Sequence, residues 1–188
     1  MSDLVEFDIA ATADAREALR AEVASDLVAA SYLRGDFVLS SGERSEFYFD
    51  KYLFETKPTI LRRVADMLAE LVPSDVERLA ATEGGGVALV AAVSLATGLP
   101  FVIIRRSTSR AGAKPVRGEL HAGERVMLVE DVVSFGNQAL TAVSRLKELG
   151  AIVVGVIAVI DREAGGAAAL ERAGQPYSPL FTLSDLDV

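Results

Sequence analysis

Two kinds of hydrophobic pattern alternate along the chain: apolar residues at helical spacing and short runs that are almost wholly apolar. Apolar residues recur at helical spacing in residues 15–33, 59–71 and 137–149, and this spacing predicts amphipathic helices. Asp14 stands before the first of them and is expected to cap its N-terminus. Shorter runs that are almost wholly apolar predict buried strands at residues 78–82, 101–105, 125–133, 152–161 and 179–183. Two further helices are expected at residues 86–97 and 164–173.

The alternation of strands and helices predicts an α/β fold. Strands that are apolar on both faces and separated by helices belong to a mainly parallel sheet covered by helices on both sides. Residues 35–52 alternate between apolar and polar positions instead and predict a hairpin or strand pair. Residues 107–124 are polar and rich in Gly and Arg, and they predict a long loop. Such sheets bind ligands beyond the carboxyl ends of their strands, so the residues directly after each strand are the candidates for function.

The composition narrows the classes of function. With 188 residues, 51% of them hydrophobic, the chain fits one domain with a substantial core. Its formal net charge of −8 repels nucleic acid phosphates, so a general DNA or RNA binder is not expected. The absence of cysteine and the single histidine, His121, exclude disulfides, thiolate metal sites, cysteine nucleophiles and zinc sites built from several histidines.

Two segments bear on where the protein resides. The first residues carry acids and no basic stretch, which is not the pattern of a secretory signal, and a cytoplasmic protein is expected. Residues 84–104 carry no charge and are long enough to span a bilayer. The glycines at 84–86 and the break at 98–100 favour a buried helix, a turn and a buried strand instead. No membrane partner is therefore expected.

One strand–loop–helix junction has the composition of an anion site. Residues 125–138 read RVMLVEDVVSFGNQ, in which a buried strand leads to two adjacent acids, Glu130 and Asp131, and a short loop precedes a helix. The loop and the helix N-terminus present unpaired N–H groups and partial positive charge, which suit a phosphate. Ser134 adds a hydroxyl donor, and Gly136 lets the backbone approach the anion closely. The two acids can accept hydrogen bonds from two sugar hydroxyls beside it.

This junction resembles the 5-phosphoribosyl-1-diphosphate (PRPP) motif of type I phosphoribosyltransferases, in which aliphatic residues, two acids, two aliphatics, a hydroxyl residue, a variable residue and glycine follow one another. Four other segments, in matching order, resemble the orotate phosphoribosyltransferase branch of that family. They are residues 35–52, similar to the orotate hood; 83–92, similar to the pyrophosphate loop and its helix; 101–106, similar to the strand before the mobile catalytic loop; and 160–163, similar to the strand end whose arginine holds the orotate carboxylate.

The resemblance implies the type I phosphoribosyltransferase fold, with a central, mainly parallel sheet flanked by helices and a small N-terminal hood. A single domain is expected over residues 1–188. The hood would comprise about residues 1–55 together with the C-terminal end of the chain. The core would comprise about residues 56–175.

A role for each matched residue follows from the same resemblance. The residues matched to PRPP binding are Arg105, Arg106, Glu130, Asp131, Val132, Val133, Ser134, Phe135, Gly136, Asn137 and Gln138. Those matched to the pyrophosphate loop are Glu83, Gly84 and Gly85, and those matched to orotate binding are Tyr48, Phe49, Lys51, Ser134 and Arg162. The catalytic candidates are Glu130, Asp131, Arg106, Arg110 and Lys114.

The implied activity is the transfer of ribose 5-phosphate from PRPP to orotate, which gives orotidine 5′-monophosphate and diphosphate in de novo pyrimidine synthesis. Mg²⁺ is the implied cofactor, held mainly by the diphosphate and ribose oxygens, so no metal-binding residue of the chain is expected. Family members are homodimers whose mobile loop closes over the neighbouring subunit's site, and a homodimer is therefore expected.

The segment that matches the mobile loop departs from the family pattern. Ser109 stands at the position of the catalytic lysine, and Ala111 at that of the usual His or Tyr. That lysine neutralises charge on the departing diphosphate. Three interpretations stay open: Arg110 or Lys114 supplies the charge from a shifted position, the enzyme is slow, or the chain is a PRPP or nucleotide sensor with little catalysis. The orotate-like hood and Arg162 argue against a phosphoribosyltransferase for another base.

Overall fold

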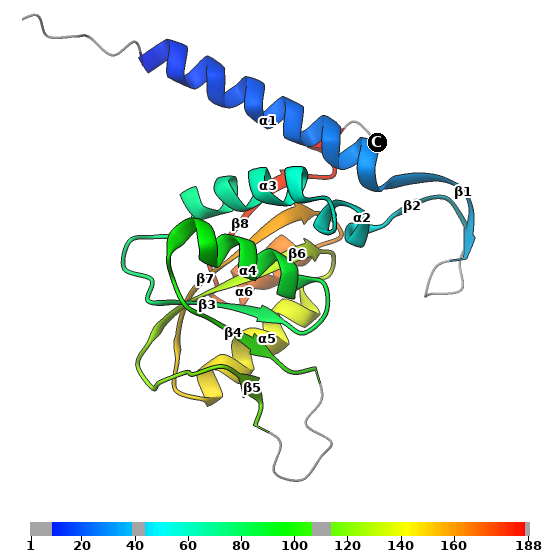
Figure 1. Ribbon diagram of the computed structural model, residues 1–188. Helices are drawn as coiled ribbons and strands as arrows, with labels where there is room; N and C mark the ends of the chain where they lie inside the picture. The colour runs from blue at the N-terminus through cyan, green and yellow to red at the C-terminus, as the bar shows by residue number, and fades with distance from the viewer. Residues whose placement is uncertain (1–8, 39–43, 107–113, 187–188) are drawn as a thin grey trace, which may run out of the picture.

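A six-stranded sheet between two layers of helices forms the body of the molecule in a computed structural model, which describes residues 9–38, 44–106 and 114–186 (Figure 1). The strands lie in the order β5-β4-β3-β6-β7-β8. Their bounds are β3 Arg78–Thr82, β4 Phe101–Ile104, β5 Val116–Arg117, β6 Arg125–Val133, β7 Ile152–Asp161 and β8 Tyr177–Thr182. Every neighbouring pair is parallel except β4 with β5. The predicted α/β fold with a mainly parallel sheet is confirmed.

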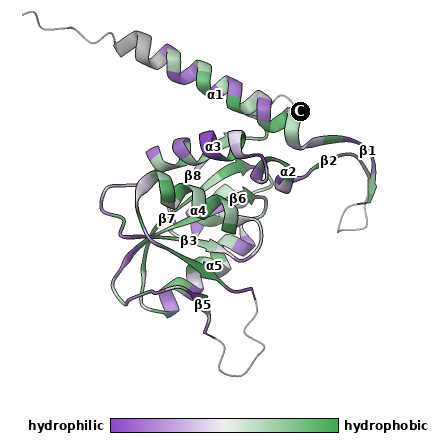
Figure 2. Cartoon of the chain, in the orientation of Figure 1, coloured by the Kyte–Doolittle hydropathy of each residue, from purple (hydrophilic) through white to green (hydrophobic). Residues whose placement is uncertain are grey.

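Helices cover both faces of the sheet, and each face has its own apolar core. One face carries α1, α3 and α4, and the other carries α5 and α6 (Figure 1). Their bounds are α1 Ile9–Ser31, α3 Pro58–Glu70, α4 Gly86–Thr97, α5 Asn137–Glu148 and α6 Gly166–Arg172. Side chains alternate along the first part of β6, so Met127 and Val129 enter the first core while Val126 and Leu128 enter the second. The strands accordingly show hydrophobic colours along much of their length in Figure 2.

The same alternation decides where the two acids of β6 point. The strand continues through Glu130 and Asp131 as far as Val133. Glu130 follows the parity of Leu128 and so faces the α5 side of the sheet. Asp131 follows the parity of Val129 and so faces the α4 side. The two adjacent acids therefore leave the strand in opposite directions.

An antiparallel strand pair follows the first helix and extends away from the sheet (Figure 1). α1 leads directly into β1 Tyr32–Val38, which pairs with β2 Arg44–Phe49. The predicted strand pair at the N-terminal side is thus confirmed. The prediction that Asp14 caps the first helix is wrong, because α1 begins at Ile9 and Asp14 lies inside it. The alanine-rich residues before Asp14 favour the helix by intrinsic propensity alone.

A single helical turn joins this strand pair to the body. α2 Lys51–Glu55 begins after Asp50, whose carboxylate accepts the N–H of Tyr52 at 3.0 Å and so caps the turn. The hydrophobic pattern did not predict α2, because five residues are too few to show a helical period. The turn places Lys51 and Glu55, four residues apart, on the same side.

Part of the long loop expected at residues 107–124 is a strand. β5 pairs antiparallel with β4, through Ile103 with Arg117 and Ile104 with Val116. A strand of two residues leaves no pattern in the sequence, so its presence was not foreseen. Its pairing returns the chain to the edge of the sheet beside β4.

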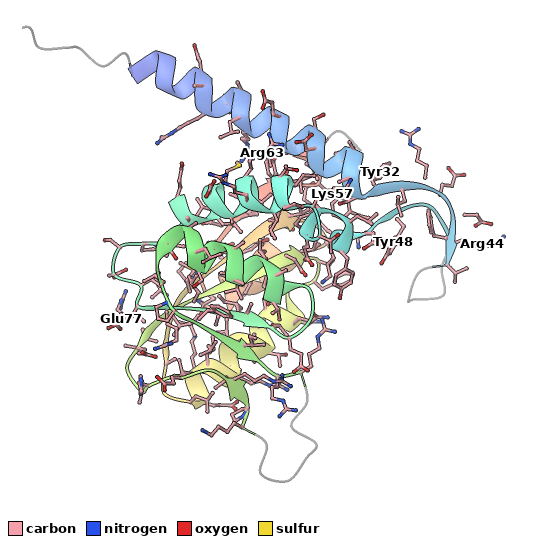
Figure 3. All side chains as sticks on the ribbon, in the orientation of Figure 1. Tyr32, Arg44, Tyr48, Lys57, Arg63 and Glu77 are labelled. Carbon is pink, nitrogen blue, oxygen red and sulfur yellow. The ribbon has the colours of Figure 1, made fainter. Side chains whose placement is uncertain are left out.

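Ion pairs attach α1 to the body. Arg63 of α3 pairs with Asp26 of α1 and, at 3.5 Å, with Glu22, and Figure 3 shows it between the two helices. Arg20 of α1 lies 3.1 Å from Asp185 in the short 3-10 helix η1, Ser184–Leu186. Across the described ranges, no helix has both the length and the apolar character that crossing a membrane requires.

Candidate active site

The carboxyl end of β6 buries two acids. Glu130 is 6% exposed and accepts the hydroxyl of Thr82, from the end of β3, at 3.2 Å. Burial, reinforced by the neighbouring charge of Asp131, raises the pKa of Glu130 to about 7. Its carboxyl therefore changes charge near neutral pH. This makes Glu130 a group that can hold or release a proton beside a bound ligand.

Asp131 is fixed on the opposite face of the same strand. It is 3% exposed, and the Nζ of Lys51 lies 2.6 Å from its Oδ2. Its Oδ1 accepts the N–H of Val132 at 2.6 Å. Burial alone lowers the pKa of Lys51, but the charge and hydrogen bond of Asp131 outweigh it, and the net shift is upward. The resemblance assigned Lys51 to orotate binding and Asp131 to the sugar hydroxyls of PRPP. In the structure the two side chains are in contact with each other.

Glu55 completes this cluster and was not singled out in the sequence. It is 4% exposed, and its carboxyl lies beside that of Asp131: a Cβ on Gly85 would be 2.9 Å from the Oε1 of Glu55 and 2.2 Å from the Oδ2 of Asp131. Burial, followed by the charge and hydrogen bond of Asp131, raises the pKa of Glu55 to about 8, although Lys51 opposes the shift. The only signal in the sequence was an acid four residues after Lys51 in the otherwise apolar end of the KYLFE turn.

The turn between β6 and α5 has the shape expected of an anion-binding loop. Gly136 adopts a left-handed conformation, with φ of +79°, and α5 starts at the next residue. The N–H of Gly166 donates to the Ser134 carbonyl at 2.8 Å, which ties the turn to the start of α6. The Phe135 side chain is 67% exposed, so its ring is turned to solvent and does not fill the turn.

The residues matched to the pyrophosphate loop lie between cations and acids. Gly84, with φ of +121°, is so close to Arg106 that a Cβ there would be 3.1 Å from its Nη2. The N–H of Arg106 is 3.4 Å from a carboxylate oxygen of Glu83. On the other side, a Cβ on Gly85 would lie 2.2 Å from the Oδ2 of Asp131. Glycine is therefore the residue that fits at position 85.

A cavity of about 260 Å³ lies between Arg106 and the start of α5. Arg106, Asn137 and Gln138 line it, so three residues matched to PRPP share one space. Arg145 of α5 also lines it and donates to the carbonyl oxygens of Arg105 and, at 3.1 Å, of Arg106. Nothing in the local pattern indicates this contact, because Arg145 has the position of an ordinary surface charge in the last turn of an amphipathic helix.

The residues matched to orotate binding are distributed over two regions. Tyr48 is 44% exposed with its ring 5.7 Å from that of Phe37, whereas Phe49 packs against the core with its ring 6.5 Å from that of Phe54. Neighbouring strand residues point to opposite faces, so the two aromatics do not form one stacked pair. Figure 3 shows Tyr48 on the strand pair, beyond the edge of the body.

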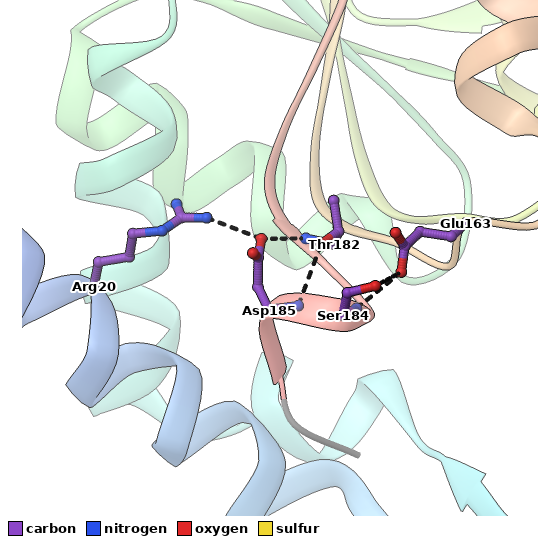
Figure 4. A network of polar contacts seen from close by, with 5 residues as sticks. All are labelled: Arg20, Glu163, Thr182, Ser184 and Asp185. Atoms are coloured by element: carbon purple, nitrogen blue, oxygen red, sulfur yellow. Dashed lines mark hydrogen bonds and ion pairs between the residues drawn. The ribbon is translucent and has the colours of Figure 1, made fainter.

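Arg162 lies beside the turn that follows β6. It is exposed at the end of β7, and its N–H donates to the Val133 carbonyl at 2.8 Å. The backbone on its C-terminal side is held in place, because Asp161 accepts the N–H of Glu163 at 2.8 Å. The Glu163 carboxylate in turn accepts the N–H of Ser184 at 2.8 Å (Figure 4). Arg162 and Ser134 therefore lie at neighbouring strand ends.

The loop that departs from the family pattern falls mostly outside the described residues. Ser109, Arg110 and Ala111 all lie there, so the structure gives no position for them. Lys114 is described and is exposed just before β5. The choice between Arg110 and Lys114 as the replacing cation stays open.

Comparisons with known proteins give one consistent result. No family model matches the chain. The orotate phosphoribosyltransferase of Methanocella arvoryzae is 42% identical over 153 residues, which cover 81% of this chain and 87% of the relative. That of Halobacterium salinarum is 40% identical over 179 residues, which cover 95% and 98%.

Solved structures agree with these relatives. Orotate phosphoribosyltransferase of Mycobacterium tuberculosis in complex with inorganic phosphate superposes with a TM-score of 0.82 at 30% identity, over 91% of this chain and 99% of that one. Its complex with PRPP gives a TM-score of 0.79, again at 30% identity, over 90% and 99%. Because relatives of this identity span most of both chains, the chain belongs to the orotate phosphoribosyltransferase family.

Proposed function

We propose that the chain transfers ribose 5-phosphate from PRPP to orotate, giving orotidine 5′-monophosphate and diphosphate, in de novo pyrimidine synthesis in the cytoplasm. One observation carries this proposal. Two buried acids, Glu130 and Asp131, stand at the carboxyl end of β6, directly before a left-handed glycine and the N-terminus of α5. Acids that can accept from sugar hydroxyls next to a phosphate-binding turn suit a phosphorylated pentose.

PRPP would lie across the carboxyl ends of β3, β4 and β6. The turn from Ser134 to Gly136 and the first residues of α5 would bind the 5-phosphate with backbone N–H groups. Glu130 and Asp131 would accept from ribose hydroxyls on either side of β6. The diphosphate would lie at the Glu83–Gly85 loop, where Arg106 already contacts Gly84. Arg105 and Arg106 would neutralise charge as the diphosphate leaves, which is a large term in such reactions.

Orotate would lie between the strand pair and the end of β7. Arg162 is the proposed partner of its carboxylate, because a guanidinium can bind a carboxylate with two hydrogen bonds. Ser134 would contribute from the neighbouring strand end. Of the two aromatics, Tyr48 is the one that the fold leaves available for contact with a base, since Phe49 packs into the core. Lys51, which forms an ion pair with Asp131, would influence orotate electrostatically.

Mg²⁺ is the proposed cofactor. Among the residues that the structure describes, no three His, Cys, Asp or Glu side chains gather in a way that could hold a metal ion. The diphosphate and ribose oxygens of PRPP would carry this cation, which commonly keeps several water ligands. A homodimer is also proposed, together with a single domain in which the hood covers about residues 1–55 and the C-terminal end.

The test is an orotate assay. Protein, PRPP, Mg²⁺ and orotate are mixed, and the loss of orotate is followed together with the appearance of diphosphate. Turnover that needs all four components supports the proposal. PRPP binding by calorimetry without turnover for orotate or any other base would identify a sensor instead. Sedimentation of the same preparation reports whether the homodimer forms.

Two variants decide which cation replaces the missing lysine. If the guanidinium of Arg110 neutralises the diphosphate, Arg110→Ala loses turnover and Lys114→Ala keeps it. If the ammonium of Lys114 does so, the outcome is reversed. Arg117→Ala, an exposed cation in β5 that has no assigned role, is the matched control.

A further inference from the structure

The cluster around Asp131 contains two acids and one cation in contact. Lys51 lies 2.6 Å from the Asp131 carboxylate, and the Glu55 carboxyl lies beside the same group. Both acids also crowd the position of Gly85, where a Cβ would lie 2.2 Å from the Oδ2 of Asp131 and 2.9 Å from the Oε1 of Glu55. The cluster therefore occupies the inner side of the proposed diphosphate loop.

The hydrogen-bond partners available to Glu55 indicate whether its carboxyl is protonated. As a carboxylate it can only accept, yet its Oε1 is fully buried and meets no donor among the described residues. As an acid it gains an O–H, and Asp131 is the acceptor in reach. Two carboxylates in such contact share one proton, because both cannot ionise without strong repulsion. With the proton retained, the charges of Lys51 and Asp131 cancel.

The geometry points to Glu55 as a positioning residue that keeps its proton at neutral pH and donates it to Asp131. Asp131 is then held between the Glu55 acid and the Lys51 ammonium, with its carboxylate in one fixed orientation for a ribose hydroxyl. This inference rests on the proposed function for the identity of the ligand. Loss of the Glu55 proton would place a second negative charge beside Asp131, where an anionic diphosphate sugar has to bind.

Other charged groups around the cluster do not reproduce this behaviour. The groups that face Glu55 are Lys51 and Asp50 at the start of α2 and Asp131 on β6. The upward shift in the pKa of Lys51, where the charge of Asp131 outweighs burial, keeps it charged through neutral and mildly basic pH. Glu130, on the other face of β6, also titrates near neutral pH. Titration of Glu130 affects the wild type and any Glu55 variant alike. The difference in pH dependence between the two proteins therefore reports on Glu55.

PRPP affinity measured by calorimetry as a function of pH tests the inference. In the wild type, the Kd for PRPP rises about tenfold between pH 7 and pH 9, because about a tenth of Glu55 keeps its proton one unit above a pKa of about 8. Glu55→Gln keeps the size and a donor but cannot ionise, so its Kd changes much less over that range. Identical pH curves for the two proteins would overturn the inference.

A second measurement needs no ligand. The folded pKa of Glu55 is raised from 4.5 to about 8, so folding stability from this group falls as pH rises from about 4.5 through 8. The melting temperature of the wild type should therefore fall relative to Glu55→Gln across that window. Glu70→Gln, an exposed acid in the last turn of α3, is the control and should follow the wild type. Parallel melting curves for wild type and Glu55→Gln would count against a retained proton.

The two proposals fail separately. If orotate is not consumed but the pH dependence of PRPP affinity still differs between wild type and Glu55→Gln, the proposed reaction is wrong and the role of Glu55 stands. If orotate is consumed and the two proteins share one pH profile, only the role of Glu55 falls. Should Glu55→Gln not fold, proton uptake by the wild type on binding PRPP, centred near pH 8, replaces the comparison. No uptake would contradict the inference.

Discussion

Arg78 and Glu124 show how one pair of side chains fixes the end of the sheet opposite the site. The guanidinium makes two 2.8 Å hydrogen bonds to the carboxylate, between the start of β3 and the residue before β6. Both side chains are largely buried, at 10% and 16% exposure. Glu124 also accepts the N–H of His121 at 2.9 Å. The local sequence pattern does not predict this pair, because the partner of Glu124 lies 46 residues away.

Glu124→Gln is expected to destabilise the fold by roughly 2–3 kcal/mol, since removal of one partner leaves the Arg78 charge partly buried without its counterion. The hydrogen bonds from Arg78 lower the pKa of Glu124 from 4.5 to about 2. Its stabilisation is therefore present above pH 4.5 and lost as pH falls toward 2. Urea unfolding at pH 7 and pH 3 measures both effects. The difference in unfolding free energy between wild type and Glu124→Gln should shrink at pH 3. The exposed control Glu119→Gln should match the wild type at both pH values.

Gly85→Ala tests how tightly the site is packed. A Cβ would lie 2.2 Å from the Oδ2 of Asp131, so that carboxylate has to move. We expect kcat/KM for PRPP to fall by about 100-fold, the order of loss that a displacement near 1 Å can cause. Gly86→Ala is the neighbouring control, because its nearest contact is the Ala81 Cβ at 3.2 Å. Equal activity of the two variants would contradict the crowding.

At the scale of elements, α5 serves both ends of the proposed PRPP site. Its N-terminus follows the Gly136 turn, and Arg145, two turns later, donates to the carbonyl oxygens of Arg105 and Arg106, directly after β4. The helix therefore fixes the distance between the phosphate turn and the point where Arg105 and Arg106 leave the sheet.

Arg145→Ala removes the donor from both carbonyl groups. We expect a higher KM for PRPP and a loss of about 1–3 kcal/mol in stability, because the carbonyl groups lose their partner. Steady-state kinetics and thermal unfolding measure the two effects. Arg172→Ala is the matched control, since that arginine also donates to a carbonyl, that of Ala168, but its exposed side chain lies in the last turn of α6. A normal KM for Arg145→Ala would show that Arg105 and Arg106 do not need this support.

The elements that the sequence predicted are those with a long, regular pattern. β6, β7 and α5 were found within one residue of their bounds, because buried strands and amphipathic helices leave periodic signals. α2 and β5 were missed because five and two residues cannot show a period. Glu55 was missed for the same reason as α2, and Arg145 because nothing in its local pattern shows a contact 40 residues away. The placement of Glu130 and Asp131 at the end of β6 was foreseen, and the strand predicted over residues 125–133 is consistent with their opposite directions.

At the scale of the whole molecule, the C-terminal end ties α1 to the strand ends of the site. Asp185 accepts from Arg20 at 3.1 Å and from the N–H of Thr182 at 2.8 Å, and Figure 4 shows this network beside Ser184 and Glu163. Arg20 also lies 4.5 Å over the ring of Phe181. The network therefore connects α1, the end of β8 and the backbone next to Arg162.

Asp185→Asn weakens the charged part of this network. The expected loss in unfolding free energy is at most about 1 kcal/mol, because the Arg20 pair is partly exposed. The Thr182 N–H bond, opposed by burial and helped by Arg20, lowers the pKa of Asp185 below 3.8, so its contribution disappears as pH falls below that value. Hydrogen exchange of α1 at pH 7 should rise in this variant. Asp66→Asn, which removes a 4.0 Å pair within α3, should leave α1 unchanged.

The single turn of α2 also has a consequence for cooperation between substrates. Its two functional side chains reach Asp131, and the strand pair ends only one residue before it. A shift of the strand pair would thus be passed to Asp131, the acid proposed to accept from ribose, with no flexible linker between them. If one substrate settles against the strand pair, it should alter the affinity for the other, and thermodynamic linkage requires the effect to be equal in both directions.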